Sequence, residues 1–411
     1  MKASLQIYRR LWRNRDLRIA LIARSVSEFG DDLALVALLL RVHDEGGGPL
    51  GVAALLIAST LPIVVLAPWA GRLADSKDSR LLIVVSAGWQ VVACLALALP
   101  LPMPAVLALV VLLQAGHAVG SPTWQALVPR LAPDEQTGPA IGAMQAMTTV
   151  AGVAGPAVGG LLLAEFGAAV PMLVDAVTFL GLAIAGLAIR TRRMADPADR
   201  DTELSGSLLT GLRTLRNDRL LWPLLLGVLA FIVVGETTNV VEVFFVRDTL
   251  GGSAFAFGVI GALLAAGLVV GSLAAGHARD DGSRTRYVLA GAAGISVALA
   301  LASLSPNVVV FGLCFALLGP LNGLANASAS TLLVVRSPDA VRGQVLAAAT
   351  ALTRGCGIGA LLVGGVVAAL ASPRVIFLVA GVCGLLVTLV MYVRLRGELE
   401  PSTVDSVTAS P

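Results

Sequence analysis

Long runs of apolar residues, separated by short polar segments, dominate the pattern of this sequence. A helix needs about 20 apolar residues to cross the hydrocarbon core of a bilayer, and twelve runs approach or exceed that length. They are Leu17–Val42, Leu50–Ala70, Leu81–Leu101, Ala105–Val128, Ala140–Ala164, Ala168–Ile189, Leu220–Val246, Ala254–Ala275, Tyr287–Leu304, Val308–Val335, Val345–Ala371 and Val375–Val393. A membrane β-barrel would instead show short alternating segments of about 10 residues. The pattern predicts an all-α integral membrane protein with twelve transmembrane helices.

The composition agrees with that prediction and excludes several other classes of protein. Of the 411 residues, 57% are hydrophobic and 13% are charged, whereas about 25% of the residues in a soluble domain are charged. This excludes a soluble globular enzyme, a disordered chain and a secreted disulfide scaffold. The four cysteines fall in apolar runs, so we expect them to pack rather than to form disulfides or bind metal. They are Cys94, Cys314, Cys356 and Cys383.

Lysine and arginine are distributed unequally between the two sides of the membrane. If the N-terminus is cytoplasmic, 24 of the 29 basic residues lie in cytoplasmic segments, and only Arg41, Arg247 and Arg374 lie in outer loops. Because positive charge accumulates on the cytoplasmic side, we expect both termini to be cytoplasmic and the protein to lie in the inner (cytoplasmic) membrane. This topology explains the basic loops without nucleic-acid binding. A basic segment leads directly into the first apolar run, so we expect no cleavable signal sequence.

The longest polar segment divides the chain into two halves. Residues 191–218 are predicted to form a cytoplasmic linker between a six-helix bundle at 1–190 and a second at 219–411. The second part of the linker places leucines and arginines at helical spacing, which is typical of a helix that lies along the membrane surface. These residues are Leu208, Leu209, Leu212, Arg213, Leu215 and Arg216.

The two halves repeat with an offset of 205 residues. The same offset relates Gly30-Asp31 to Gly235-Glu236, Gly71 and Asp75 to Gly276 and Asp280, Pro133 and Gly138 to Pro338 and Gly343, and Gly159-Gly160 to Gly364-Gly365. An offset shared by several pairs of helices indicates a parallel repeat of two pseudo-symmetric bundles. We therefore expect a substrate to bind near the membrane midplane, between the two halves.

Four motifs resemble those of the major facilitator superfamily, and most closely those of its twelve-span drug:proton antiporter branch, which contains macrolide and siderophore exporters. The first motif runs from Arg15 through Arg24 to Gly30-Asp31, and the second contains Gly71 and Asp75 and is followed by Arg80. The third is Pro122–Pro129 at the end of the fourth helix. The fourth, in the fifth helix, is similar to the family's antiporter motif and contains Gly155, Pro156, Gly159 and Gly160.

The resemblance implies the major facilitator fold, alternating access, and gating by the second and fourth motifs. The fourth motif marks exporters in the family. Pro156 would kink its helix, and the glycines would let a neighbouring helix approach closely, which suits a gate. The sequence departs from the family in two places. Ser76, Asp78 and Ser79 interrupt the second motif, and the fourth helix lacks the arginine of the family's proton-transfer motif.

Acidic residues inside the predicted helices are candidates for transport sites, because a charge at the centre of a bilayer costs at least about 2.5 kcal/mol. Asp31 lies past the centre of the first helix, and Glu236 occupies the equivalent position in the seventh. The resemblance implies that these helices line the cavity, so we expect the two acids to face each other. We predict that they and Asp175 couple proton and substrate, since a desolvated carboxyl group binds either a proton or a cation. The alternative is structural pairing with an arginine.

Other polar side chains are candidates for the substrate cavity. Arg24 and Glu28 are four residues apart and should pair on one helix face. Arg354 could neutralise an acid or bind an anionic substrate, Asn239 could hydrogen-bond a substrate, and Trp124 offers either an aromatic surface or a packing group. His43, His117 and His277 form no ligand constellation, so no metal site is expected. The sequence contains no phosphate loop and no nucleophile motif, so we expect neither an enzyme nor a cofactor.

Together these features predict a monomeric exporter of amphipathic small molecules such as antibiotics, energised by the proton gradient. The first alternative is the same fold with a narrow natural substrate, such as a siderophore or a lysolipid. The second is a membrane sensor or scaffold that transports nothing. The second is disfavoured because the longest loop, at about 30 residues, is too short for the soluble effector domain that a sensor needs.

Overall fold

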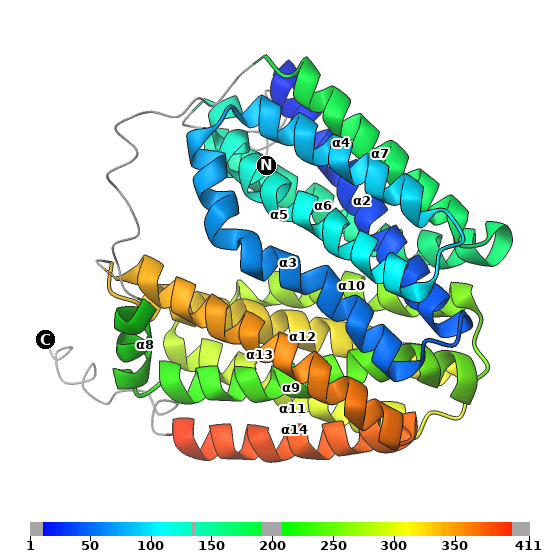
Figure 1. Ribbon diagram of the computed structural model, residues 1–411. Helices are drawn as coiled ribbons and strands as arrows, with labels where there is room; N and C mark the ends of the chain where they lie inside the picture. Colours follow the sequence, from blue (N-terminus) through cyan, green and yellow to red (C-terminus); the bar gives the residue numbers. More distant parts are fainter. Residues whose placement is uncertain (1–10, 134–135, 191–207, 340, 397–411) are drawn as a thin grey trace, which may run out of the picture. The chain divides into compact units, whose positions relative to one another are not determined.

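The computed structural model describes residues 11–133, 136–190, 208–339 and 341–396, and this part of the chain is helical and contains no β-strand. Six long helices precede the linker (Figure 1): α2 (Arg15–Asp44), α3 (Gly48–Ser76), α4 (Ser79–Leu97), α5 (Met103–Leu131), α6 (Thr137–Phe166) and α7 (Ala169–Ala188). After a short helix α8 (Leu208–Asn217), six more follow: α9 (Leu221–Phe244), α10 (Ala254–Ala275), α11 (Asp281–Ser303), α12 (Val308–Arg336), α13 (Arg342–Leu370) and α14 (Pro373–Leu395). A π-helical turn, η3 (Phe245–Thr249), extends α9.

Eleven of the described helices are long and apolar enough to cross a membrane. The remaining long helix is α2, which has 30 residues but carries Arg24, Glu28, Asp31 and Asp32 along its length. Its length equals that of a spanning helix, and its neighbours are spanning helices, so α2 is the twelfth transmembrane helix. The prediction of an all-α membrane protein with twelve transmembrane helices is confirmed.

The described residues divide into two compact units. The first lies within Met1–Glu203, Glu242–Ala265 and Gly365–Ala369, and the second within Leu204–Val241, Ala266–Gly364 and Leu370–Pro411. The end of α9, η3 and the first half of α10 therefore pack with α2–α7. The repeat predicts a different division, into two bundles that are each continuous in the sequence, 1–190 and 219–411. That division stays a prediction. Most of the predicted linker, residues 191–207, lies outside the described residues.

Packing within each unit follows the repeat. In the first unit α4 packs against α5 and α7, and in the second the equivalent helix α11 packs against α12 and α14 (Figure 1). The C-terminal end of each third helix is also held by an arginine. Arg41 donates to the carbonyl oxygens of Leu97 (2.9 Å), Leu99 (3.4 Å) and Leu101 (3.2 Å), and Arg374 donates to that of Ser303 (3.0 Å). These bonds satisfy carbonyls that a helix end leaves without partners.

Glycines on α6 let two helices approach its backbone. A methyl group at Gly155 would meet the Phe29 carbonyl oxygen of α2 at 3.0 Å, and one at Gly159 would collide with the Leu33 carbonyl. On the side of α10, a methyl group at Gly160 would collide with the carbonyl oxygen of Ala254. Pro156 contributes to the same contact, because its carbonyl oxygen occupies the space that a side chain at Gly258 would need. The close approach expected of the fourth motif is present on both faces of α6.

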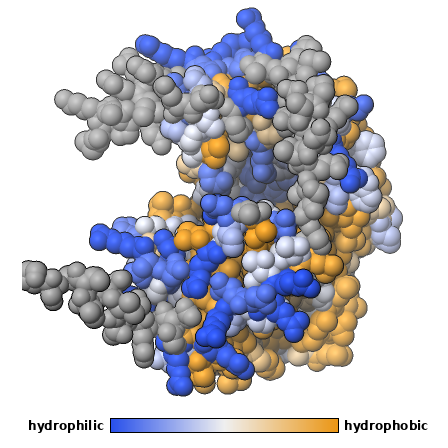
Figure 2. Space-filling view, turned by 90° about the vertical axis from the view of Figure 1, so that its left-hand side faces the viewer, coloured by the Kyte–Doolittle hydropathy of each residue, from blue (hydrophilic) through white to orange (hydrophobic). Residues whose placement is uncertain are grey.

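The predicted amphipathic segment is the helix α8. Gly211 and Leu215 face the second unit and are buried, whereas Leu208 and Leu209 are exposed. Gly211 lies directly against the backbone of Gln344 at the start of α13, and Leu215 joins the apolar core of the unit. Figure 2 views the end of the molecule that carries α8. Hydrophilic residues gather on this face and hydrophobic residues cover the adjoining flank, as expected where helices leave a bilayer.

We expect Arg41→Met to destabilise the protein by about 2–4 kcal/mol, because three carbonyl oxygens lose a buried cationic donor. The apparent melting temperature of the detergent-purified protein measures this loss. Arg15→Met is the matched control, since Arg15 is 52% exposed and forms only a surface pair with Asp16 at 3.9 Å. Equal melting temperatures for the two variants would show that Arg41 does not fasten the end of α4.

We expect Gly159→Ala to lower the melting temperature, because the added methyl group forces α6 away from α2 at a cost of about 1–3 kcal/mol. Gly142→Ala, on the same helix, adds its methyl group to open space and should leave stability unchanged or raise it by up to about 1 kcal/mol through helix propensity. A Gly159→Ala protein as stable as Gly142→Ala would contradict the close packing of the two helices.

Candidate functional site

Three charged side chains of α2 and a histidine of α5 meet inside the first unit. The Arg24 guanidinium pairs with Glu28, with Nη2 and Oε2 2.5 Å apart, as the i, i+4 spacing predicts. On the other side of Arg24, its Nη1 atom lies 4.0 Å from Oδ2 of Asp31. The His117 ring approaches the same oxygen, at 3.7 Å from Nδ1. One carboxyl oxygen of Asp31 therefore lies between two cationic or protonatable groups and touches neither closely.

The Asp31 carboxyl group lies farther from its cationic neighbours than the Glu28 carboxyl group does from Arg24. Its Oδ2 atom is buried and accepts no hydrogen bond from any described residue. A buried carboxylate without a hydrogen-bond donor is costly, and it gains most from binding a proton or a cation. The arrangement can therefore exchange one positive ligand for another at Asp31, while the closer pairing keeps Glu28 engaged with Arg24.

Asp175 of α7 lies beside α2, next to this cluster. A methyl group at Gly30 would collide with Oδ1 of Asp175 and with the Thr178 hydroxyl, so a glycine directly before Asp31 is what lets α7 come this close. The Thr178 hydroxyl donates to Oδ1 (3.1 Å), and the Cys94 thiol of α4 donates to Oδ2 (3.3 Å). Asp175 is fully buried and, unlike Asp31, has a donor on each carboxyl oxygen.

Sequence reasoning missed two members of this site. Cys94 was expected only to pack, but its thiol is a hydrogen-bond donor to Asp175. His117 belongs to no metal-binding group among the described residues, but it is a neighbour of Asp31. A signal for His117 existed, because it is the only histidine inside a predicted membrane span.

The second unit holds a separate polar group on α9 and α13. The Asn239 amide donates to Oε2 of Glu236 (3.3 Å), and Gly357 of α13 faces the same carboxylate. Arg354, three residues before Gly357, acts on Glu236 electrostatically. Glu236, Asn239 and Arg354 are thus brought together as neighbours. Asp31 belongs to the first unit and Glu236 to the second, so their facing each other across a cavity stays a prediction.

The remaining predicted residues are placed as follows. Trp124 is 1% exposed and packs in the first unit, so a place in the substrate cavity would require another conformation. Gly71 has open space around it, Arg80 is half-buried, and the side chain of Asp75 lies outside the described ones.

In the second unit, the Ser283 backbone amide donates to Asp280, the repeat equivalent of Asp75 (2.7 Å). This bond holds the pKa of the Asp280 carboxyl below its usual value.

The C-terminal ends of α2 and η3 meet through a histidine that lies between two aspartates. Both His43 ring nitrogens lie 2.8 Å from a carboxyl oxygen, Nδ1 from Asp44 and Nε2 from Asp248. Arg247 donates to the same Asp44 oxygen (3.3 Å). His43 and Asp248 are separated by the repeat offset of 205 residues.

Comparison with known proteins identifies the family. Residues 20–360 and 240–409 match the family model of the Major Facilitator Superfamily. Macrolide efflux protein A of Streptococcus pyogenes is 22% identical over 309 residues, which cover 72% of this chain and 75% of that protein. Lysophospholipid transporter LplT of Yersinia enterocolitica is 27% identical over 331 residues, with 80% and 81% covered.

A solved structure shares the fold. It is a bacterial homologue of the human lysosomal transporter Spinster in an inward-facing, unoccupied conformation. It matches with a TM-score of 0.72 at 15% identity and covers 95% of this chain and 99% of that one. The match extends over both halves of the chain, as do the family match and the internal repeat. The protein is a membrane transporter without enzymatic chemistry, and it belongs to the major facilitator superfamily.

Proposed function

We propose that this transporter exports amphipathic small molecules, antibiotics among them, by alternating access, and that protons moving inward through the Asp31 cluster drive it. The observation that carries the proposal is the buried Oδ2 atom of Asp31, which has no hydrogen-bond donor among the described residues while Arg24 and His117 stand 3.7–4.0 Å away. Such a carboxyl group binds a proton when no cation is present and releases it when a cationic substrate arrives.

Competition for one carboxyl group produces antiport directly. A protonated Asp31 would be stable in the apolar interior, and a cationic substrate entering from the cytoplasm would displace the proton. The His117 ring lies 3.7 Å from Asp31, in the helix that lacks the family's arginine, and is proposed to orient the Asp31 carboxyl group. Glu236, with Asn239 and Arg354 beside it, is proposed as the corresponding site of the second half.

The packing of α6 supports the direction of transport. Gly155 and Gly159 bring the backbone of α2 onto α6, and Gly160 does the same for α10. Close backbone contact on two faces leaves little room for a substrate to pass beside α6, which suits a seal in an exporter. The name of the macrolide efflux relative is consistent with this direction.

Alternating access requires the contact at the outer ends of α2 and η3 to open. These segments belong to the first helix of each predicted half, so movement of 1–190 against 219–411 would separate His43 from Asp248. The contacts of His43 with Asp44 and Asp248, and of Arg247 with Asp44, would hold the outer side closed until the halves move.

A second candidate is export of a lysolipid by the same fold. It is favoured by the lysophospholipid transporter, which is similar over 80% of this chain. An anionic headgroup would bind the cationic members of the two polar groups, Arg24 and Arg354, instead of the acids. A flux that is fastest with anionic substrates would favour this candidate.

We expect Asp31→Asn to reduce proton-driven drug flux in proteoliposomes to the level of protein-free liposomes, because the amide cannot exchange a proton. Glu236→Gln should impair flux in the same assay. Asp339→Asn is the matched control, since Asp339 is 89% exposed and pairs only with Arg342. Full flux in both Asp31→Asn and Glu236→Gln would show that these acids do not couple transport.

We expect His43→Gln to loosen the contact between α2 and η3, because the amide cannot contact Asp44 and Asp248 in the geometry of the ring. A Phe244→Cys substitution places a thiol beside residue 43, since the centroids of the His43 and Phe244 rings lie 5.3 Å apart. An impermeant maleimide should label this thiol about three- to fivefold faster in His43→Gln than in the parent protein, which corresponds to about 1 kcal/mol for a partly exposed pair.

His277→Gln, at an exposed histidine on the other membrane side by the predicted topology, should leave the labelling rate unchanged. An equal labelling rate in the parent protein and in His43→Gln would contradict a gate held by His43.

A further inference from the structure

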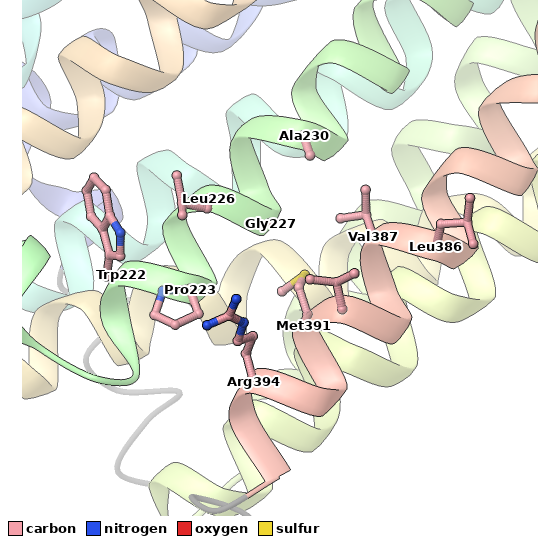
Figure 3. A pocket seen from close by; sticks show the side chains of 10 residues that line it. Trp222, Pro223, Leu226, Gly227, Ala230, Leu386, Val387, Met391 and Arg394 are labelled. Atoms are coloured by element: carbon pink, nitrogen blue, oxygen red, sulfur yellow. The ribbon is translucent and has the colours of Figure 1, made fainter.

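Helices α9 and α14 of the second unit leave a groove of ≈ 580 Å³ between them (Figure 3). Its floor is formed where Gly227 of α9 lies against Met391 of α14, since a methyl group at Gly227 would collide with the methionine sulfur. On the α14 side, Leu386 and Val390 form the wall and are 58% and 59% exposed. The groove is therefore deep, apolar and open along its length.

The open side of the groove faces the bilayer. The exposed large side chains of α14 run along the helix and are apolar, a surface that acyl chains cover and water does not. They are Val375, Leu378, Val379, Val382, Leu385, Leu386, Leu389, Val390, Tyr392 and Val393. The groove thus lies where a phospholipid chain is always available.

One end of the groove is cationic. Arg394, in the last turn of α14, extends toward Pro223 and Trp222 at the start of α9 (Figure 3). No acidic side chain in the described part of the chain pairs with it. By the arginine distribution this end is cytoplasmic, and tryptophan with arginine is the usual pair at that interface. An apolar channel that ends in a guanidinium without an acidic partner among the described residues complements a lipid whose headgroup carries a net negative charge.

We propose that this groove binds an anionic phospholipid of the inner leaflet as a resident lipid, with its phosphate on Arg394 and one acyl chain between Leu226 and Val390. The site is independent of the substrate pathway and does not rest on the proposed transport function. Recognition depends on the headgroup charge, because a zwitterionic lipid would bring its own cation to Arg394.

Native mass spectrometry of the full-length protein tests the site, with phosphatidylglycerol and phosphatidylcholine of identical chains supplied in equal amounts. We expect the protein to retain phosphatidylglycerol preferentially, and Arg394→Gln to lower that preference about fivefold. Arg396→Gln is the matched control. It removes the same charge two residues farther along the chain, and the Arg396 side chain does not line the groove. Ala230→Trp, which fills the apolar arm, should reduce retention of both lipids.

Three results would overturn the proposal. The first is an unchanged preference in Arg394→Gln, and the second is an equal loss in Arg394→Gln and Arg396→Gln, which would reveal general surface charge. The third is a dimer that retains no lipid, which would assign the groove to a second copy of the chain. None of these readouts uses transport, so they are distinguishable from a failure of the proposed exporter function.

Discussion

The contact of the α2 backbone with α6 and α7 determines where the charged cluster around Asp31 lies in the first unit. Gly155 and Gly159 let α6 lie on one side of α2, and Gly30 lets Asp175 of α7 lie on the other. With both sides occupied, the charged face of α2 points at α5, where His117 approaches Asp31. A charge in a bilayer must find its partners within the protein, so these small residues decide which partners Asp31 can reach.

The carboxyl groups of this cluster differ in how completely hydrogen-bond donors and cations pair with them. Glu28 is held by Arg24, and Asp175 has a hydroxyl and a thiol donor. Asp31 differs from both, because the groups nearest to its buried Oδ2 atom lie 3.7–4.0 Å away and no described donor reaches it. Such inequality is useful to a transporter, because the satisfied groups hold the site together while the unsatisfied one changes its ligand.

Much of the fold follows from the sequence, because the bilayer makes apolar length a direct signal. The helix ends are less well predicted. α3 was expected at Leu50–Ala70 and covers Gly48–Ser76, since helical hydrogen bonding continues after the apolar run stops, whereas α4 was expected at Leu81–Leu101 and ends at Leu97. The site is less predictable. The i, i+4 spacing gave the pair of Arg24 with Glu28, but the rotation of α4 and α5 about their axes, which brings Cys94 and His117 inward, is fixed by contacts between helices. The repeat locates equivalent positions and says nothing about such rotations.

The central claim is that a proton and a cationic substrate compete for Asp31. Its most direct measurement is proton release on drug binding, with the detergent-purified protein in weakly buffered solution and a pH-sensitive dye. Addition of a cationic macrolide should acidify the solution in proportion to the drug bound, and Asp31→Asn should abolish this proton release and weaken drug binding. Saturable binding to the parent protein without acidification, or acidification that is undiminished in Asp31→Asn, would contradict the account.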